Sequence, residues 1–318
     1  MKPLVAITGG NGFIGKVLST KLLSCGYRVR IFTRHLPKPQ LTNPDITFVQ
    51  VDYDQADSLA KALEGCEGIF SLAGTLFGFG YKDFEKGNVL AVRNLVAAAN
   101  QTDSVKTVVH VSSLAASGYA KDPQSPRLES QEPAPVSDYG RTKLLGEKEI
   151  SQLDQRIKYT IVRPPIVYGK NDSGVSKIAT WVRRGLMVNT SGNGYFSFVY
   201  VEDLVEALYQ AYTRSDTHGQ IYFVAEPDAY TWDYFITEMA QAMHVKKPFM
   251  PKAPVWLMRG AAWMYELCAK ITNTQPALNY DKVAEAAIDG HWICSSQKWR
   301  TLTGQQFTPL KKGLEKSF

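Results

Sequence analysis

A glycine-rich turn near the start of the chain restricts the fold more than any other feature of the sequence. The apolar run Leu4–Thr8 leads into TGGNGFIG at residues 8–15, after which apolar residues recur at helical spacing. Gly9 suits a tight turn, Gly12 lets a phosphate approach the backbone, and Gly15 permits close packing of helix on strand. The free N–H groups at the start of that helix favour an anion. The pattern predicts a dinucleotide-binding βα unit; a tight turn that binds nothing is the alternative.

Short apolar runs and longer amphipathic runs alternate through the first half of the chain. The predicted strands cover residues 4–8, 27–33, 46–52, 68–74, 105–113 and 159–167, and the predicted helices between them include 58–63, 84–100 and 139–153. Strands that alternate with helices form a parallel sheet that is covered on both faces. We therefore expect an α/β fold, a doubly wound parallel sheet of the Rossmann type.

The alternation weakens beyond Gly169, which predicts a second, smaller unit. We expect residues 1–169 to form the dinucleotide-binding domain, with 197–226 returning to it. Residues 170–196 and 227–318 would form a smaller, mainly helical C-terminal substrate lobe. The apolar segment Ala253–Thr272 in that lobe is either a buried or dimer-contact helix, or a helix at a membrane surface or against a lipid substrate.

Composition excludes several other classes of protein. The 318 residues are 44% hydrophobic and 21% charged, which is typical of a globular protein with a real core. The net charge of +6 is spread without a basic run or zinc-finger spacing, so we expect no nucleic-acid partner. Four separated cysteines without a Cys-x-x-Cys pair predict neither a disulfide framework nor a metal site, and favour a reducing, cytoplasmic compartment. No uncharged stretch reaches transmembrane length, so we expect no membrane span.

The end of the second predicted strand bears on the choice of cofactor. NAD-binding folds usually place an acid there for the ribose 2′-hydroxyl, whereas an arginine accommodates the 2′-phosphate of NADP. Here the strand ends in Thr33 and Arg34, with no acid. The sequence favours NADP(H) over NAD(H), with a solvated strand-end charge as the alternative.

A tyrosine and a lysine open the helix that follows the fifth predicted strand. Tyr139 and Lys143 are four residues apart, so they share one helix face and can both point at the carboxyl edge of the sheet. Ser112 and Ser113 end the fifth strand at that same edge. A surface Tyr/Lys pair and a plain strand end are the alternatives, but their common placement favours a catalytic group.

These motifs together identify a family. The chain resembles the extended short-chain dehydrogenase/reductases, which include sugar-nucleotide epimerases, dihydroflavonol-type reductases and 3β-hydroxysteroid dehydrogenases. The matching segments are TGGNGFIG at 8–15, VSS at 111–113, YGRTK at 139–143, VRPPIVYG at 162–169 and FVYVEDLVEA at 198–207. The resemblance implies that Tyr139 donates or accepts the proton, that Lys143 lowers the tyrosine pKa and holds the nicotinamide ribose, and that Ser113 rather than Ser112 holds the substrate oxygen. It also implies a homodimer formed through the helices at 84–100 and 139–153.

The resemblance also places residues around the cofactor. Asp52 with Tyr53 would contact the adenine, or simply begin a loop. Asn88 would organise the site, or serve as a structural helical asparagine. The full expected set is Gly9, Gly12, Phe13, Ile14, Gly15, Thr33, Arg34, Asp52, Tyr53, Leu72, Ala73, Gly74, Asn88, Tyr139, Lys143, Pro164 and Ile166.

The substrate is less well defined by the sequence. No acid follows Ser113 to expel water, which argues against sugar dehydration. The lobe is rich in large apolar side chains, which suits an apolar alcohol or ketone better than a nucleotide sugar. We therefore expect a nicotinamide-dependent oxidoreductase that acts on a secondary alcohol or ketone as its small-molecule partner. The alternatives are a nucleotide-sugar epimerase with tightly bound NAD and a non-catalytic dinucleotide-binding subunit.

Overall fold

Seven parallel strands form the central sheet of the protein. The computed structural model describes residues 2–37, 43–187, 194–251, 260, 263, 264, 281, 283, 285 and 288–318. Within these residues the sheet runs β3-β2-β1-β4-β5-β6-β9. The strands are β1 (Leu4–Thr8), β2 (Arg28–Thr33), β3 (Ile46–Gln50), β4 (Gly68–Ser71), β5 (Thr107–Val111), β6 (Lys158–Arg163) and β9 (Gln220–Phe223). This order confirms the predicted doubly wound Rossmann sheet, in which the strand order reverses between β1 and β4.

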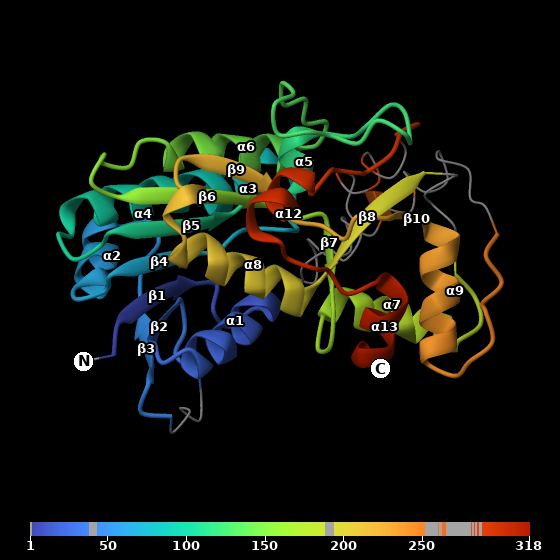
Figure 1. The fold of residues 1–318 in the computed structure, drawn as a ribbon, viewed down its shortest axis with the longest axis horizontal. Helices are drawn as coiled ribbons and strands as arrows, with labels where there is room; N and C mark the ends of the chain where they lie inside the picture. Colours follow the sequence, from blue (N-terminus) through green and yellow to red (C-terminus); the bar gives the residue numbers. More distant parts are fainter. Residues whose placement is uncertain are drawn as a thin grey trace.

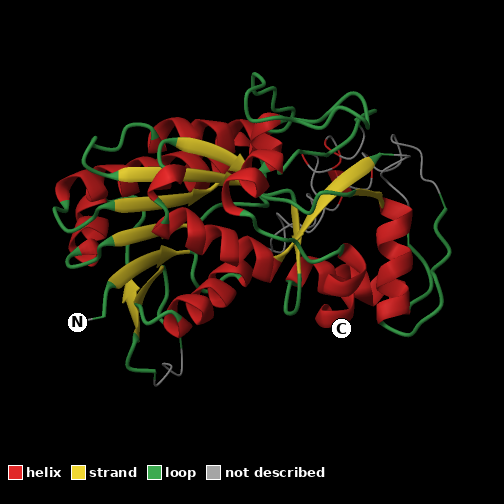
Figure 2. Cartoon of the chain, viewed as in Figure 1, coloured by secondary structure: helices red, strands yellow, loops and turns green. Residues whose placement is uncertain are grey.

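Helices cover both faces of the sheet, as Figures 1 and 2 show. Successive residues of a strand point to opposite faces, so Val5 and Ile7 face one core and Leu4 and Ala6 the other. The first core is closed by α1 (Phe13–Ser24) and α8 (Val201–Thr213). The second is closed by α2 (Ala56–Leu63), α4 (Ala91–Gln101) and α6 (Asp138–Ile150). β1 and β4 in the middle of the sheet are buried on both faces, and they read as nearly continuous apolar runs.

Two prolines divide one expected strand between two sheets. The sequence predicts a single strand over 159–167, but β6 ends at Arg163 and β7 (Ile166–Tyr168) begins after Pro164 and Pro165. Proline has no N–H to donate to a ladder, so the chain leaves the large sheet at this point. β7 pairs with β8 (Tyr195–Tyr200), which pairs in turn with β10 (Ala229–Thr231).

The chain returns from the three-stranded sheet to the central sheet later than the sequence predicts. Residues 197–226 were expected to return as a whole, but β8 stays in the three-stranded sheet, and the return begins with α8 and continues into β9. The lobe therefore contains strands as well as α7 (Ser173–Arg183), α9 (Trp232–Ala242) and α13 (Leu310–Ser317). Figure 1 shows this lobe on the side toward which the strands of the central sheet point, which is the edge where ligands bind in such folds.

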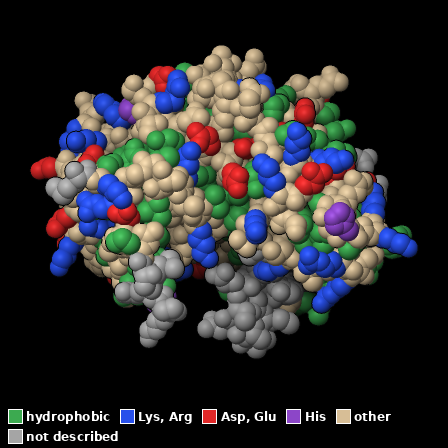
Figure 3. All heavy atoms as spheres, turned by 60° about the horizontal axis from the view of Figure 1, so that its bottom comes forward, with side chains coloured by type: hydrophobic (Ala, Val, Ile, Leu, Met, Phe, Trp, Pro, Cys, Tyr) green, Lys and Arg blue, Asp and Glu red, His purple; other side chains and the backbone are tan. Residues whose placement is uncertain are grey.

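Two further expectations concern the apolar segment 253–272 and the absence of a membrane span. Most of the segment 253–272 lies outside the described residues; Trp263 and Met264, which are described, are largely exposed. In the part of the chain that the structure covers, no helix combines the length and apolar content needed to cross a bilayer. On the face shown in Figure 3, Lys and Arg side chains lie interspersed with Asp and Glu side chains.

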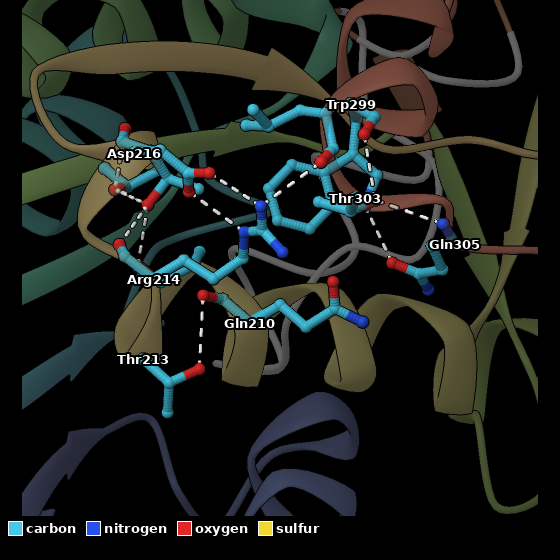
Figure 4. A network of polar contacts seen from close by, with 11 residues as sticks. Gln210, Thr213, Arg214, Asp216, Trp299, Thr303 and Gln305 are labelled. Carbon is cyan, nitrogen blue, oxygen red and sulfur yellow. Dashed lines mark hydrogen bonds and ion pairs between the residues drawn. The ribbon is translucent and has the colours of Figure 1, made fainter.

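The short helix α12 (Gln297–Thr303) attaches the C-terminal part of the chain to the β9 edge. Trp299 is fully buried, its ring centroid lies 5.2 Å from that of Tyr222, and its Nε1 donates to Gln305 Oε1 at 2.7 Å. Arg214, just after α8, donates to both carboxylate oxygens of Asp216 and to the Leu302 carbonyl oxygen at 3.2 Å. Figure 4 shows these contacts side by side, joining α8, α12 and the turn before β9.

Trp299 should be a principal source of stability at this edge. We expect Trp299→Ala to lower the free energy of unfolding by about 3–5 kcal/mol, because it leaves a large cavity and removes the hydrogen-bond donor of Gln305 Oε1. The control is Trp181→Ala on α7, whose side chain is 51% exposed. That variant should stay within about 0.5 kcal/mol of the unaltered protein. Chemical unfolding followed by far-ultraviolet circular dichroism measures both, and equal losses would contradict the assignment.

Candidate active site

The glycine-rich turn brings backbone atoms into close approach at the strand-order reversal. Gly9 has φ +70°, and a Cβ there would lie 2.9 Å from the Ala73 nitrogen. A Cβ on Gly15 would lie 2.5 Å from both Gly10 Cα and the Gly9 oxygen. Gly12 is the N-cap of α1 and supplies no side-chain acceptor, and the first turn holds no acid. The N–H groups of that turn, including those of Phe13 and Ile14, therefore suit the phosphates of a dinucleotide.

Hydrogen bonds connect this turn to its two neighbouring strands. Asn11 Nδ2 donates to Thr33 Oγ1 at 3.1 Å, at the end of β2, where Arg34 lies exposed. The N–H groups of Leu72 and Ala73, which follow β4, donate to Thr8 Oγ1 at 3.1 and 3.0 Å. These hydrogen bonds hold the glycine-rich turn to the end of β2 on one side and to the end of β4 on the other.

Asp52 and Tyr53 lie beyond the end of β3, beside β2. The Asp52 carboxylate accepts the Asp54 N–H at 2.9 Å, which is the turn-forming contact expected of a loop-starting aspartate. The Tyr53 hydroxyl donates to the Phe32 carbonyl oxygen at 3.3 Å, and burial raises its pKa to about 12. Asp52 is exposed at this end of the sheet, so the carboxylate can also face an adenine ribose.

Asn88 lies in a π-helical turn instead of the continuous helix that the sequence predicts over 84–100. The chain runs through α3 (Tyr81–Glu85), a π-helical turn (Lys86–Leu90) and then α4. Buried Asn88 accepts the Thr75 N–H at 2.8 Å and donates to the Thr75 oxygen and to Thr142 Oγ1, each at 3.1 Å. π-Turns occur frequently at functional sites. This asparagine fixes the start of the loop 75–80 against α6.

Lys143 is buried at the carboxyl end of β5. Its Nζ donates to the Val111 carbonyl oxygen at 2.7 Å, and a Cβ on Gly74 would lie 3.8 Å from Nζ and 2.9 Å from Asn88 Oδ1. Burial lowers the pKa of Lys143 to about 8, and the charge of Glu147 acts in the opposite direction. The ammonium is therefore present at neutral pH and is lost as the pH rises through about 8.

The two serines after β5 have different surroundings. Ser113 is the N-cap of α5 (Leu114–Ser117), and its Oγ accepts the Ala115 N–H at 3.1 Å. Its own hydroxyl hydrogen can therefore be directed to another acceptor. Ser112 is buried and donates to Glu147 Oε1. The structure thus favours Ser113 over Ser112 as the serine that meets a substrate.

Tyr139 lies at the start of α6, against α5. Its ring packs with Ala115, Phe84 and Trp292, and its centroid lies 6.2 Å from that of Phe84. A Cβ on Gly140, the next residue, would lie 2.4 Å from the Ala115 oxygen, so α5 and α6 are in direct backbone contact. Tyr139 and Ser113 therefore lie on neighbouring elements at one edge of the sheet.

Residues distant in sequence also position this helix, and sequence reasoning missed them. The Asp281 carboxylate accepts the N–H groups of Asp138 and Tyr139 at 2.7 and 3.2 Å. Ser137 donates to Glu285 Oε1 at 2.5 Å and caps the helix by accepting the Gly140 N–H. Negative charge at a helix N-terminus is stabilising. No local signal identifies Asp281, because its partners lie more than 140 residues earlier.

The expected residues fall into two groups along the carboxyl edge. Thr33, Arg34, Asp52 and Tyr53 follow β2 and β3, on one side of the glycine-rich turn. The other group follows β4, β5 and β6 or begins α6, and comprises Leu72, Ala73, Gly74, Asn88, Ser113, Tyr139, Lys143, Pro164 and Ile166. Within it, Pro164 accepts the Leu114 N–H at 2.9 Å, which brings the end of β6 against α5. This division suits a dinucleotide whose two halves lie on either side of the strand-order reversal.

Comparison with known proteins agrees with this geometry. Residues 5–225 match the model of the NAD dependent epimerase/dehydratase family. A putative dihydroflavonol 4-reductase from Synechocystis sp. is 28% identical over 305 residues, covering 91% of this chain and 86% of that protein. An uncharacterized protein, y4nG of Sinorhizobium fredii, is 32% identical over 207 residues; the match covers 63% of this chain and only 51% of that protein. The structure of MoeE5 in complex with UDP-glucuronic acid and NAD has the same fold, with a TM-score of 0.77, 22% identity and coverage of 98% and 97% of the two chains.

The chain therefore belongs to the NAD-dependent epimerase/dehydratase family, within the extended short-chain dehydrogenase/reductases. It is an enzyme of the oxidoreductase or epimerase type with an NAD(P)-binding Rossmann domain. The family assignment confirms the resemblance read from the motifs.

The Gly15 packing can be tested directly. We expect Gly15→Ala to weaken NADPH binding by at least about tenfold, because its Cβ would meet backbone atoms that cannot move without opening the turn. Gly174→Ala is the control, since its nearest atom would be Asp172 Oδ1 at 3.5 Å, an ordinary contact. Fluorescence titration with NADPH measures both variants, and thermal unfolding separates lost binding from lost folding. An unchanged dissociation constant for Gly15→Ala would contradict this account of the turn.

Proposed function

We propose that the protein is an NADP(H)-dependent oxidoreductase that interconverts an apolar secondary alcohol and the corresponding ketone. The observation that carries this proposal is the burial of Lys143 on the carbonyl oxygen of Val111, two residues before Ser113. Tyr139 lies one helical turn before Lys143 on the same helix. A bound nicotinamide supplies or accepts the hydride.

The side chains divide the remaining work. Ser113 directs its hydroxyl hydrogen to the substrate oxygen, since its Oγ already accepts the Ala115 N–H. Tyr139 gives a proton to that oxygen during reduction and takes it back during oxidation. A free phenol has a pKa of about 10. In the proposed reaction the ammonium of Lys143 stabilises the phenolate that Tyr139 becomes when it gives up its proton. Lys143 also donates to the nicotinamide ribose.

Arg34 supports NADP(H) as the cofactor. It is exposed immediately after β2, at the position where an acid would select the ribose 2′-hydroxyl of NAD. A guanidinium there can pair with the 2′-phosphate.

Apolar surface near the candidate site supports the substrate class. Trp292 packs beside Tyr139, and Leu76 in the loop 75–80 is 55% exposed. Trp292 offers a substrate apolar contact next to the reactive phenol, and Leu76 adds exposed apolar surface to the loop that Asn88 holds. The name of the Synechocystis relative, a putative dihydroflavonol 4-reductase, also fits a reductase of this kind.

A nucleotide-sugar epimerase with tightly bound NAD is the second candidate. It is favoured by the fold shared with MoeE5, which was solved with UDP-glucuronic acid and NAD. An epimerase would purify with its nicotinamide bound, whereas a reductase consumes added NADPH. Absorbance of the purified protein, followed by a screen of hydrophobic ketones and nucleotide sugars, distinguishes the two.

Dimerisation through the segments 84–100 and 139–153 stays a prediction that light scattering can test.

Removal of the phenol oxygen tests the chemistry. We expect Tyr139→Phe to reduce kcat by at least about 10²-fold, because the proton donor is lost, while NADPH still binds. Tyr159→Phe, on β6 and packed against the core that α2, α4 and α6 close, is the matched control and should retain full activity. Steady-state kinetics and NADPH titration measure the two properties. Turnover retained in Tyr139→Phe would rule out the mechanism.

A change of charge at the end of β2 tests the cofactor. We expect Arg34→Asp to raise KM for NADPH by at least about tenfold more than KM for NADH, because the aspartate repels the 2′-phosphate. Arg28→Asp makes the same change of charge at the other end of the strand and should affect both cofactors equally. Equal effects of Arg34→Asp on the two cofactors would refute the preference for NADP(H).

A further inference from the structure

A buried ion pair joins α6, the helix that carries Tyr139 and Lys143, to the end of β6. Glu147 on α6 and Arg163 at the end of β6 are only 4% and 2% exposed. Arg163 donates through Nε to Oε1 at 2.8 Å and through Nη2 to Oε2 at 2.6 Å, a two-pronged geometry. The other side of the guanidinium lies over the Phe223 ring, 5.8 Å from its centroid. Burying two charges is costly even when they are paired, so stability alone is a weak reason for such a pair.

The same carboxylate joins the two elements that carry the candidate catalytic groups. Glu147 lies one helical turn after Lys143, on the same face of α6. Its Oε1 also accepts a hydrogen bond from Ser112, the residue immediately before Ser113. A single side chain therefore fixes α6 relative to the end of β5. It also accepts the hydroxyl hydrogen of Ser112, so that hydrogen is not directed to a substrate in place of the one on Ser113.

The carboxylate also affects the charge of Lys143. The hydrogen-bond acceptor of Lys143 is the neutral carbonyl oxygen of Val111. His110 on β5 is buried against Ser71, and burial together with the Lys143 charge lowers the His110 pKa well below its usual range, so it is neutral. The acid whose charge acts on Lys143 is Glu147.

Among the described residues, the neighbours named next carry positive charge or none, and the nearby acid Glu129 accepts the N–H of Phe223 at 2.8 Å. Arg163 holds Glu147, and Arg127 lies close enough to Arg163 for the Arg163 charge, together with burial, to lower the pKa of Arg127. Asn88 and Thr142, which lie on the other side of Lys143, are uncharged. Loss of the Glu147 charge would therefore leave Lys143 without a compensating negative charge from these neighbours.

We propose that Glu147 is a positioning residue of the active site: clamped by Arg163, it aligns Lys143 with Ser113 and keeps the lysine in its ammonium form. This role rests on the proposed function, in which Lys143 holds the nicotinamide ribose. The residue would act through Lys143 and Ser112 and would touch neither substrate nor cofactor itself.

The pH dependence of NADPH binding tests the proposal without knowledge of the substrate. Dissociation constants would be measured by fluorescence between pH 6 and 10 for the unaltered protein, Glu147→Gln, Glu147→Asp and Glu149→Gln. In the unaltered protein we expect affinity to fall as the pH rises through about 8, where Lys143 loses its proton. In Glu147→Gln the midpoint should move down by about one pH unit, because the opposing charge is gone. Glu147→Asp keeps the charge and should keep the midpoint.

Glu149→Gln is the matched control. Glu149 lies on the same helix and pairs with an arginine, Arg93, but on a more exposed face. Its substitution should leave the midpoint where it is in the unaltered protein. A purely structural Glu147 would lower thermal stability and leave the midpoint of Glu147→Gln unmoved, and that result would overturn the inference.

The experiment also distinguishes failure of the proposed function from failure of this inference alone. If the unaltered protein bound neither NADPH nor NADH, the proposed function would fail, and the inference with it. Normal binding with an unmoved midpoint would refute the inference alone. If Glu147→Gln does not fold, the double variant Glu147→Gln/Arg163→Met removes both buried charges, a change that proteins often tolerate. The midpoint should then still move down, and an unmoved midpoint would again refute the proposal.

Discussion

The close approach of backbone at the ends of β1 and β4 is the constraint on which the rest of the structure depends. Gly9 adopts a left-handed φ of +70°, and its missing Cβ leaves room for the Ala73 nitrogen. Thr8 Oγ1 accepts both N–H groups that follow β4, which fixes the two strand ends together. Because the strand order reverses here, the helices depart to opposite faces and a crevice opens between them.

The side of that crevice with the candidate catalytic residues depends on α6. This helix carries Tyr139 and Lys143, is held to the loop 75–80 through Asn88 and Thr142, and is joined to β5 and β6 by Glu147. These polar groups are buried, so each needs a partner of good geometry, and their mutual contacts leave the helix little freedom to shift. Precise placement of the lysine thus comes from packing as much as from the helix itself.

The central sheet was predictable because its information is local. Apolar runs with glycines between them fix strands and helices, and the β1–α1 turn is set by the chemistry of three glycines. The departures have equally specific causes. Pro164 and Pro165 divide one predicted strand between two sheets, and a π-helical turn interrupts the helix expected over 84–100 where Asn88 turns toward Thr75. Neither the partner strand of β7 nor the extra residue of a π-turn has a distinct periodicity in the sequence.

The sequence by itself determined the class of fold, the dinucleotide turn and the candidate pair Tyr139 and Lys143, because each follows from residue type and spacing within one element. The choice of Ser113 over Ser112 came from the resemblance to the family. Only the tertiary structure decided which serine donates a hydrogen bond to Glu147. It also decided that Asp281 and Glu285 contact the N-terminus of α6. It likewise decided that Lys143 is buried enough to lower its pKa to about 8. Burial and long-range pairing depend on contacts between residues that are distant in the sequence, from 32 positions for Lys143 and Val111 to 148 for Ser137 and Glu285. No local pattern encodes where such segments meet.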